Sequence, residues 1–308
     1  MLTTRAALPK DAKHDFYSFT ADEMDRGGGG SILGSEFGSN ALLFLSAGNV
    51  RENGGDTTAT ALAALFFYLS HNPRCYDELA DEIRSTFRAG DDIRSGPALA
   101  SCRYLRASID EALRLSPPIG GTLWREATRS DQEPNPFTVD GHVIPPGTQI
   151  GVNTYALHHN ERYFPDKFAF KPDRWLESAD ATNPEEQERL KLMREALNPF
   201  STGVRGCPGK SLAYMEISLV MAKTLFYFNF EVDRGEKGEK EKRRGKGSTP
   251  PPTVFSCRDV FTSTHDGTYR VCTTHPPTLK FPTTGIRGWV KNYVDEQGCV
   301  GKMKLLTD

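Results

Sequence analysis

The sequence predicts a mainly α-helical protein with small β-sheets. Apolar residues recur at helical spacing or in alanine- and leucine-rich runs over residues 56–69, 76–87, 99–115 and 210–228. Such stripes are typical of helices that bury one face. Short β-like runs occur at residues 137–139 and 149–152, where they stand between Pro and Gly turns. Helical pattern therefore clearly exceeds strand pattern.

The remaining segments divide the chain into three regions. Residues 1–40 are polar and glycine-rich and are predicted to be a linker or disordered, residues 41–275 form the folded region, and residues 276–308 form a divergent tail. Within the folded region, Pro73 predicts a helix restart and Pro117-Pro118 ends a helix. The sequence also predicts an irregular stretch at 153–175, a charged helix at 184–196, and two strands at 254–262 and 268–273 that pair with each other.

Composition excludes several classes of protein. The formal net charge of -2 and the pI near 6.4 give no basic excess, so nucleic acid is not an expected partner. The longest apolar run, residues 59–69, is shorter than the ~20 residues of a membrane span. Six scattered cysteines without a C-x-x-C pair argue against a zinc ribbon or a disulfide framework. Adjacent His158 and His159 are not expected to share a metal ion.

Cys207 has the most informative surroundings of the six cysteines. It lies in Phe-Ser-Thr-Gly-Val-Arg-Gly-Cys-Pro-Gly, residues 200–209, directly before a predicted helix. The glycines allow sharp turns and leave backbone N–H groups open. A helix N-terminus stabilises negative charge, and Arg205 adds a nearby cation. These residues alone indicate a thiolate that is either a nucleophile or a metal ligand.

This loop resembles the haem-binding motif F-x-x-G-x-R-x-C-x-G of the cytochrome P450 monooxygenases, and every fixed position matches. The resemblance implies haem b (iron protoporphyrin) as the cofactor, with the Cys207 thiolate as the axial iron ligand. It also implies that Arg205 pairs with a haem propionate and that Phe200 packs near the sulfur. The implied cofactor-binding residues are Arg125, Phe200, Gly203, Arg205, Cys207 and Gly209.

Two further motifs resemble the same family. Glu111-Ala-Leu-Arg114, followed about 60 residues later by Phe-Lys-Pro-Asp-Arg174-Trp, implies a buried structural triad of Glu111, Arg114 and Arg174. Gly-Asp56-Thr57-Thr resembles the oxygen-activation motif and implies that Asp56 and Thr57 are catalytic, managing protons and dioxygen. Read alone, Asp-Thr-Thr fits a helix N-cap equally well.

The oxygen-activation motif departs from the family pattern. Ala47-Gly48 would normally stand one residue before Asp56, but residues 49–55 intervene. Kept helical, six extra residues would rotate the upstream face by about 240°. The sequence therefore predicts that residues 51–55 loop out and break this helix.

The resemblance covers about residues 41–269 and corresponds to the C-terminal part of the family fold. It implies a partial cytochrome P450 fold that lacks the N-terminal helices. The implied function is insertion of one oxygen atom of O2 into an apolar small-molecule substrate, with electrons from a reductase. Two alternatives stay open: a catalytically inactive truncated fragment, or an O2-independent haem-thiolate isomerase or dehydratase. Relatives of this type are usually anchored in the endoplasmic reticulum, but no anchor is expected here, so localisation stays unassigned.

Overall fold

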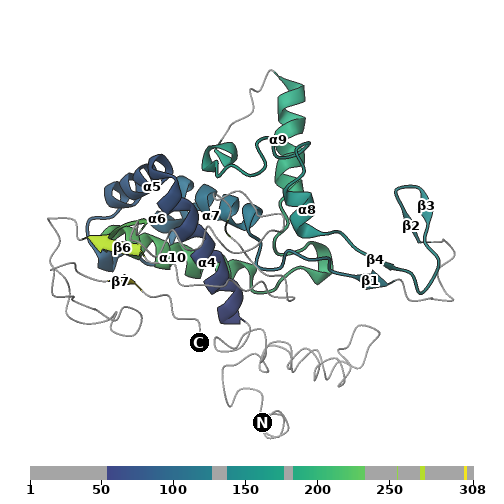
Figure 1. Ribbon diagram of the computed structural model, residues 1–308, viewed down its shortest axis with the longest axis horizontal. Helices are drawn as coiled ribbons and strands as arrows, with labels where there is room; N and C mark the ends of the chain where they lie inside the picture. The colour runs from purple at the N-terminus through teal and green to yellow at the C-terminus, as the bar shows by residue number, and fades with distance from the viewer. Residues whose placement is uncertain are drawn as a thin grey trace, which may run out of the picture. The chain divides into compact units, whose positions relative to one another are not determined.

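The computed structural model describes residues 54–126, 137–176, 183–232, 255, 271–274 and 302–303 (Figure 1). The chain divides into two compact units, Met1–Gly55 and Asp56–Asp308, and almost every described residue belongs to the second. The predicted linker at 1–40 and the predicted helix at 41–48 lie outside the described residues. Apart from residues 302–303, so does the predicted tail.

The prediction of a mainly helical fold with small sheets is confirmed. The α-helices are α4 (Gly54–His71), α5 (Pro73–Thr86), α6 (Pro97–Ala100), α7 (Arg103–Leu115), α8 (Thr154–His158), α9 (Pro184–Ala196) and α10 (Lys210–Tyr227). Short 3₁₀ turns are η2 (Gly90–Asp92), η3 (Pro172–Trp175) and η4 (Gly203–Arg205). The predicted helix at 184–196 has the same bounds as α9, because Asn183 caps it and Pro184 opens it.

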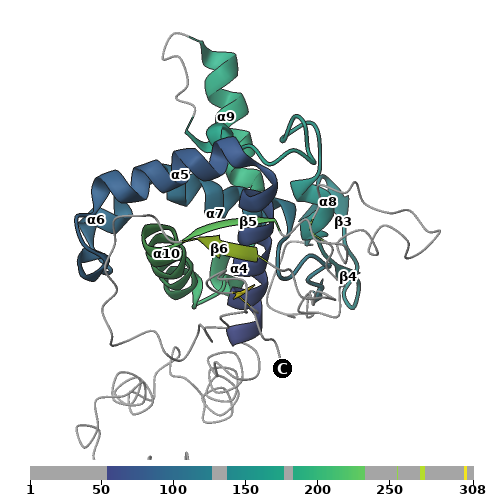
Figure 2. The same ribbon diagram turned by 60° about the vertical axis from the view of Figure 1, so that its left-hand side comes forward.

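The main core is formed by α4, α5, α7 and α10. Helix α7 packs against α5 and α10, and α5 also packs against α10 (Figure 2). The apolar stripes of these helices supply fully buried side chains, among them Leu65, Leu79, Leu105, Met221 and Leu225. Full burial of each such side chain stabilises the fold by about 1.5–3 kcal/mol relative to exposure.

The single helix predicted over residues 99–115 is wrong, because the structure divides it into α6 and α7. Helix α6 ends at Ala100, and Cys102 has non-helical dihedral angles at the start of α7. The Glu82 carboxylate on α5 accepts hydrogen bonds from the backbone N–H groups of Tyr104 and Leu105, both at 2.8 Å. A carboxylate from another helix thus caps the free amides of the first α7 turn and determines where α7 begins.

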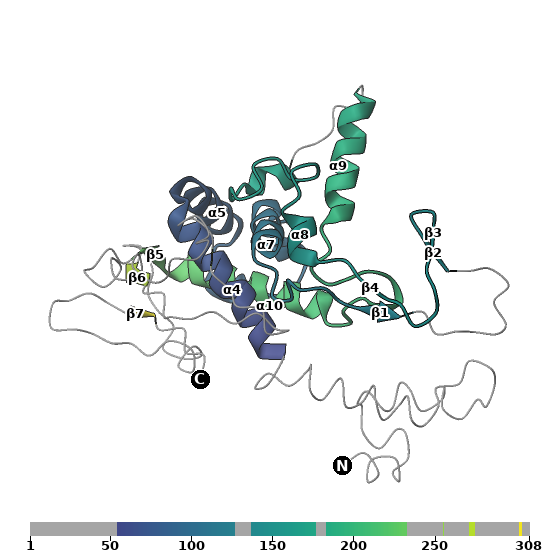
Figure 3. The same cartoon turned by 45° about the vertical axis from the view of Figure 1, so that its right-hand side comes forward.

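The described strands form short antiparallel pairs. Strand β1 (Arg125–Glu126) pairs with β4 (Gln149–Ile150), and β2 (Thr138–Val139) pairs with β3 (His142–Val143), as Figure 3 shows. Strand β6 (Val271–Thr274) lies between β5 (Asn229–Val232) and β7 (Lys302–Met303). The strands predicted at 137–139 and 149–152 are therefore confirmed, with shorter bounds.

Two sequence-based predictions need correction. The strand predicted at 268–273 corresponds to β6, but its partners are β5 and β7 rather than residues 254–262, of which only Phe255 is described. The stretch predicted as irregular, residues 153–175, contains α8 and η3. Helix α8 forms because the Asn153 side chain accepts a hydrogen bond from the Ala156 N–H at 2.8 Å. In the part of the chain that is described, no helix has the length and apolar character needed to cross a membrane.

Candidate haem-thiolate site

The loop of residues 200–209 closes on itself immediately before α10. Ser201 and Gly203 adopt left-handed backbone conformations with φ of 59° and 67°. The Gly206 N–H donates to the Gly203 carbonyl at 2.9 Å, and the Cys207 N–H donates to the Phe200 carbonyl at 2.8 Å. The cysteine backbone is thus held by a bond across the loop at the point where α10 starts.

The Cys207 thiol is free and exposed, whereas Cys75 and Cys102 are buried. Burial raises the pKa of both buried thiols. A side chain at residue 209 would place its Cβ only 3.7 Å from the Cys207 sulfur, so the glycine there keeps one side of the sulfur clear. An accessible thiol with little side-chain cover fits the thiolate ligand of a haem-thiolate iron.

The three other side chains predicted to bind haem differ in their surroundings. Phe200 is half-buried, and its ring centroid lies 5.2 Å from that of Tyr214 on α10. Arg205 is exposed. Arg125 is also exposed, and its Nη1 donates to the Trp124 carbonyl at 2.9 Å. Among the described residues, no hydrogen bond or ion pair joins Arg125 to the loop, so the structure does not bring these two parts of the predicted site into direct contact.

The structure brings Glu111, Arg114 and Arg174 together in a buried cluster. The Glu111 and Arg114 side chains are 0% exposed, and that of Arg174 is 7% exposed. Glu111 Oε1 accepts from Arg114 Nη2 at 2.9 Å and from Arg174 Nε at 3.1 Å, and Oε2 accepts from Arg114 Nε at 3.0 Å. The carboxylate is thus shared between α7 and η3.

Two donors that sequence reasoning did not identify complete the shell around Glu111. The Lys171 backbone N–H donates to Oε1 at 3.1 Å, and the Trp175 indole donates to Oε2 at 3.0 Å. Arg114 in turn donates to three backbone carbonyls; these belong to His158, Lys167 and Ala169. These bonds fasten α7 to α8 and to the segment that leads into η3.

His158 links this cluster to the segment that leads into residues 200–209, and its role was not predicted from the sequence. It is buried, its carbonyl accepts from Arg114, and its Nε2 accepts from the Asn198 backbone N–H at 3.1 Å. Burial, assisted by the positive charge of Arg114, lowers the pKa of His158 to about 4. Because the imidazole is neutral, its Nε2 can accept the hydrogen bond from the Asn198 N–H. Asn198 lies two residues before Phe200, where the loop begins. No local sequence pattern signals this contact.

Asp56 and Thr57 lie in the first turn of α4. Asp56 is exposed and Thr57 is half-buried. Among the described residues, no hydrogen bond or ion pair joins Asp56 to the Cys207 loop. The prediction that Gly54 and Gly55 loop out is wrong, because both belong to α4. An acidic residue in the first turn stabilises the helix start there. Residues 49–53 lie outside the described part of the chain.

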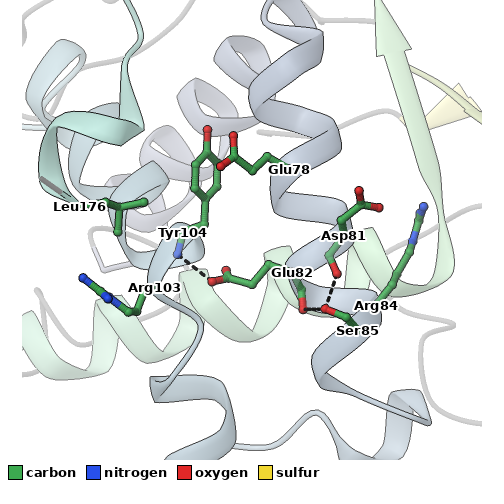
Figure 4. Close-up of a pocket in the computed structure, with 8 residues that line it drawn as sticks. All are labelled: Glu78, Asp81, Glu82, Arg84, Ser85, Arg103, Tyr104 and Leu176. Carbon is green, nitrogen blue, oxygen red and sulfur yellow. Dashed lines mark hydrogen bonds between the residues drawn. The ribbon is translucent and has the colours of Figure 1, made fainter.

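A surface pocket of about 720 Å³ lies between α5 and the start of α7 (Figure 4). Its lining residues are Glu78, Asp81, Glu82, Arg84, Ser85, Arg103, Tyr104 and Leu176. Glu82 is already engaged in capping α7. No lining residue comes from residues 200–209, so this pocket is separate from the candidate haem site. No group of three or more potential metal-ligating His, Cys, Asp or Glu side chains occurs within the described ranges.

Comparison with known proteins identifies the class. The family model described as cytochrome P450 matches residues 3–258. The chain belongs to the cytochrome P450 family. This match begins at residue 3, whereas the resemblance noted in the sequence begins at about residue 41. The domain boundary predicted at residue 40 stays a prediction.

Fungal proteins are among the similar curated sequences. Cytochrome P450 monooxygenase apf8 of Gibberella fujikuroi is 38% identical over 80% of this chain and 63% of its own length. Cytochrome P450 monooxygenase poxM of Penicillium oxalicum is 40% identical over 73% of this chain and 40% of its own length. Cytochrome P450 monooxygenase AKT7 of Alternaria alternata is 43% identical over 59% of this chain and 34% of its own length. The chain thus spans between about a third and two thirds of these relatives.

Proposed function

We propose that this chain carries the iron-ligating part of a haem-thiolate monooxygenase. The reaction inserts one oxygen atom of O2 into an apolar organic substrate, with electrons from a reductase. The observation that carries this proposal is the accessible Cys207 thiol, held by the Cys207–Phe200 backbone hydrogen bond directly before α10. The names of the fungal relatives give further support for monooxygenase chemistry.

In this proposal each residue has a defined task. Cys207 supplies the thiolate to the iron of haem b, Gly203 allows the left-handed turn of the loop, and Gly209 leaves the space beside the sulfur without a side chain. The exposed guanidinium groups of Arg205 and Arg125 neutralise the haem propionates. When bound, the haem supplies the O2 and one-electron chemistry that protein side chains lack.

The remaining roles belong to residues farther from the sulfur. Asp56 and Thr57 hold protons and transfer them toward dioxygen during oxygen activation. The buried cluster of Glu111, Arg114 and Arg174 has a structural task, since the hydrogen bonds that join the three side chains are buried.

A spectroscopic experiment tests the iron ligand. The full chain is purified with added haem, reduced and exposed to carbon monoxide. Thiolate ligation is expected to give the red-shifted Soret band of this family, and Cys207→Ala is expected to abolish it. Cys102→Ala, which alters a buried cysteine, is the matched control and should keep the band. A Cys207→Ala protein that keeps the band would refute the assignment.

We keep a second candidate function, in which a haem-thiolate centre rearranges or dehydrates a peroxide without O2 or a reductase, because among the described residues no hydrogen bond or ion pair joins Asp56 to the Cys207 loop. Turnover of an organic hydroperoxide under argon, without an electron donor, would support this candidate. Strict dependence of product formation on both O2 and reductase would exclude it.

A further inference from the structure

Helix α7 carries a second carboxylate, the half-buried Asp110, which faces α10 rather than the Glu111 cluster. Tyr214 Oη donates to Asp110 Oδ1 at 2.6 Å, and Arg106 Nε donates to Asp110 Oδ2 at 2.9 Å. The Arg106 guanidinium also lies 3.7 Å from the centroid of the Tyr214 ring. Three side chains from two helices thus hold one another, with a charge-assisted hydrogen bond at the centre.

This cluster is shielded from water on the side of Asp110. The Asp110 side chain is 14% exposed, compared with 53% for Arg106. Burial raises the pKa of the Asp110 carboxyl, while Arg106 and Tyr214 oppose that rise. Burial and the neighbouring Asp110 raise the pKa of Tyr214, so that the phenol keeps its proton and remains a donor.

Tyr214 connects this cluster to the cysteine loop. Its ring packs on that of Phe200, with centroids 5.2 Å apart and an interplanar angle of 48°. The Phe200 carbonyl is the acceptor for the Cys207 N–H at 2.8 Å. A continuous series of contacts therefore runs from Asp110 on α7, through the rings of Tyr214 and Phe200, to the backbone of Cys207.

We propose that Tyr214 is a positioning residue for Cys207: anchored between Asp110 and Arg106, it supports Phe200 and thereby keeps the Phe200–Cys207 backbone bond closed. Its importance for catalysis rests on the proposed function, because that function makes Cys207 the iron ligand. The mechanical role of Tyr214 is independent of the proposed function and is measurable on the full chain without haem.

The first experiment measures hydrogen–deuterium exchange of the peptide that spans residues 199–209. Tyr214→Phe keeps the ring and removes the hydroxyl donated to Asp110. Because a hydrogen bond to a charged group is lost, we expect exchange at the Cys207 amide to become roughly tenfold faster. Alkylation of Cys207 by iodoacetamide, followed by mass spectrometry of the same peptide, is expected to change in rate as well. Tyr214→Leu, which also removes the ring, should have a larger effect on both.

The matched control is Tyr76→Phe. The Tyr76 hydroxyl donates at 3.3 Å to Oδ1 of Asn229 in β5, which follows the C-terminal end of α10, so its removal should leave the 199–209 peptide unchanged. Asp110→Asn keeps an acceptor for Tyr214 without its charge and should give an intermediate exchange rate. Wild-type exchange in both Tyr214 variants would overturn the proposal. Equally accelerated exchange along the whole of α10 would also overturn it, because it would indicate a general loss of stability.

The second experiment uses haem-loaded protein. At equal haem content, Tyr214→Phe should lower the fraction of the carbon monoxide complex that shows the thiolate-type Soret band, and Tyr76→Phe should not. An unchanged fraction in Tyr214→Phe would overturn the positioning role at the iron. If Cys207→Ala kept the thiolate-type band, the proposed function would fail, while the exchange measurements would still decide the mechanical role of Tyr214.

Discussion

Replacing Glu111 by glutamine removes the buried charge that holds two arginines. Glutamine keeps one acceptor oxygen, but its NH2 group replaces the other. If the NH2 group occupies the Oε2 position, it faces Arg114 Nε and the Trp175 indole. At the Oε1 position it faces Arg114 Nη2, the Lys171 N–H and Arg174 Nε. Either orientation therefore sets donors against donors and loses at least two hydrogen bonds.

The expected cost follows from the complete burial of Glu111. Breaking a buried ion pair by removing one partner costs about 3–5 kcal/mol. That is a large share of the ~5–15 kcal/mol by which folded domains are stable. The Glu111→Gln chain should therefore unfold at a much lower urea concentration, and Arg114 should remain attached to its three backbone carbonyls in whatever folded fraction is left.

The assay is a urea titration followed in parallel by far-UV circular dichroism and by tryptophan fluorescence. Glu188→Gln is the matched control, because Glu188 pairs with Lys191 at 3.6 Å with both side chains well exposed. We expect no change in its unfolding midpoint. A Glu111→Gln protein that lost less than about 1 kcal/mol would refute the structural role of the cluster.

Three further predictions concern single positions. The pKa of His158 is about 4 in the folded protein, compared with 6.5 in the unfolded chain. Its contribution to stability is therefore complete above pH 6.5 and is lost as the pH falls toward 4, by about 1.4 kcal/mol per pH unit. His158→Gln should flatten this dependence in urea titrations between these pH values. Gly203→Ala should cost about 1–2 kcal/mol in the same assay, because φ is 67° there; an unchanged midpoint would contradict the left-handed conformation. Leu79→Ala empties a site that is 0% exposed, so thermal unfolding should report a loss of about 2–5 kcal/mol, and a smaller loss would mean that the core refills the cavity.

Local patterns in the sequence were sufficient for elements that depend on their own residues. Helix α9 was predicted with its observed bounds, because Asn183 and Pro184 form a local start signal. The break between α6 and α7 was missed because its cause is Glu82, a side chain on another helix. Helix propensity and hydrophobic periodicity contain no information about a cap provided by a side chain about twenty residues away.

The candidate site shows the same division. Glu111, Arg114 and Arg174 could be named because their motifs resemble a known family, and the structure places them in contact. Two other contacts could not be predicted from spacing. Tyr214 meets Asp110 across 104 residues, and His158 meets the Asn198 backbone across 40. Each depends on how whole helices pack, which is determined by many buried side chains at once.

The sequence separations around α7 have a consequence for synthesis on the ribosome. Glu111 meets Arg174 across 63 residues, and Asp110 meets Tyr214 across 104. At roughly 5–20 residues per second, α7 is made several seconds before either partner exists. During that interval Glu111 can bond only with groups near it in sequence, and Arg114, one turn away, is the available one. Helix α5 is already present and can pack against α7, but the part of α7 that packs against α10 stays uncovered until α10 has been translated, so this apolar surface is open to other contacts during the interval.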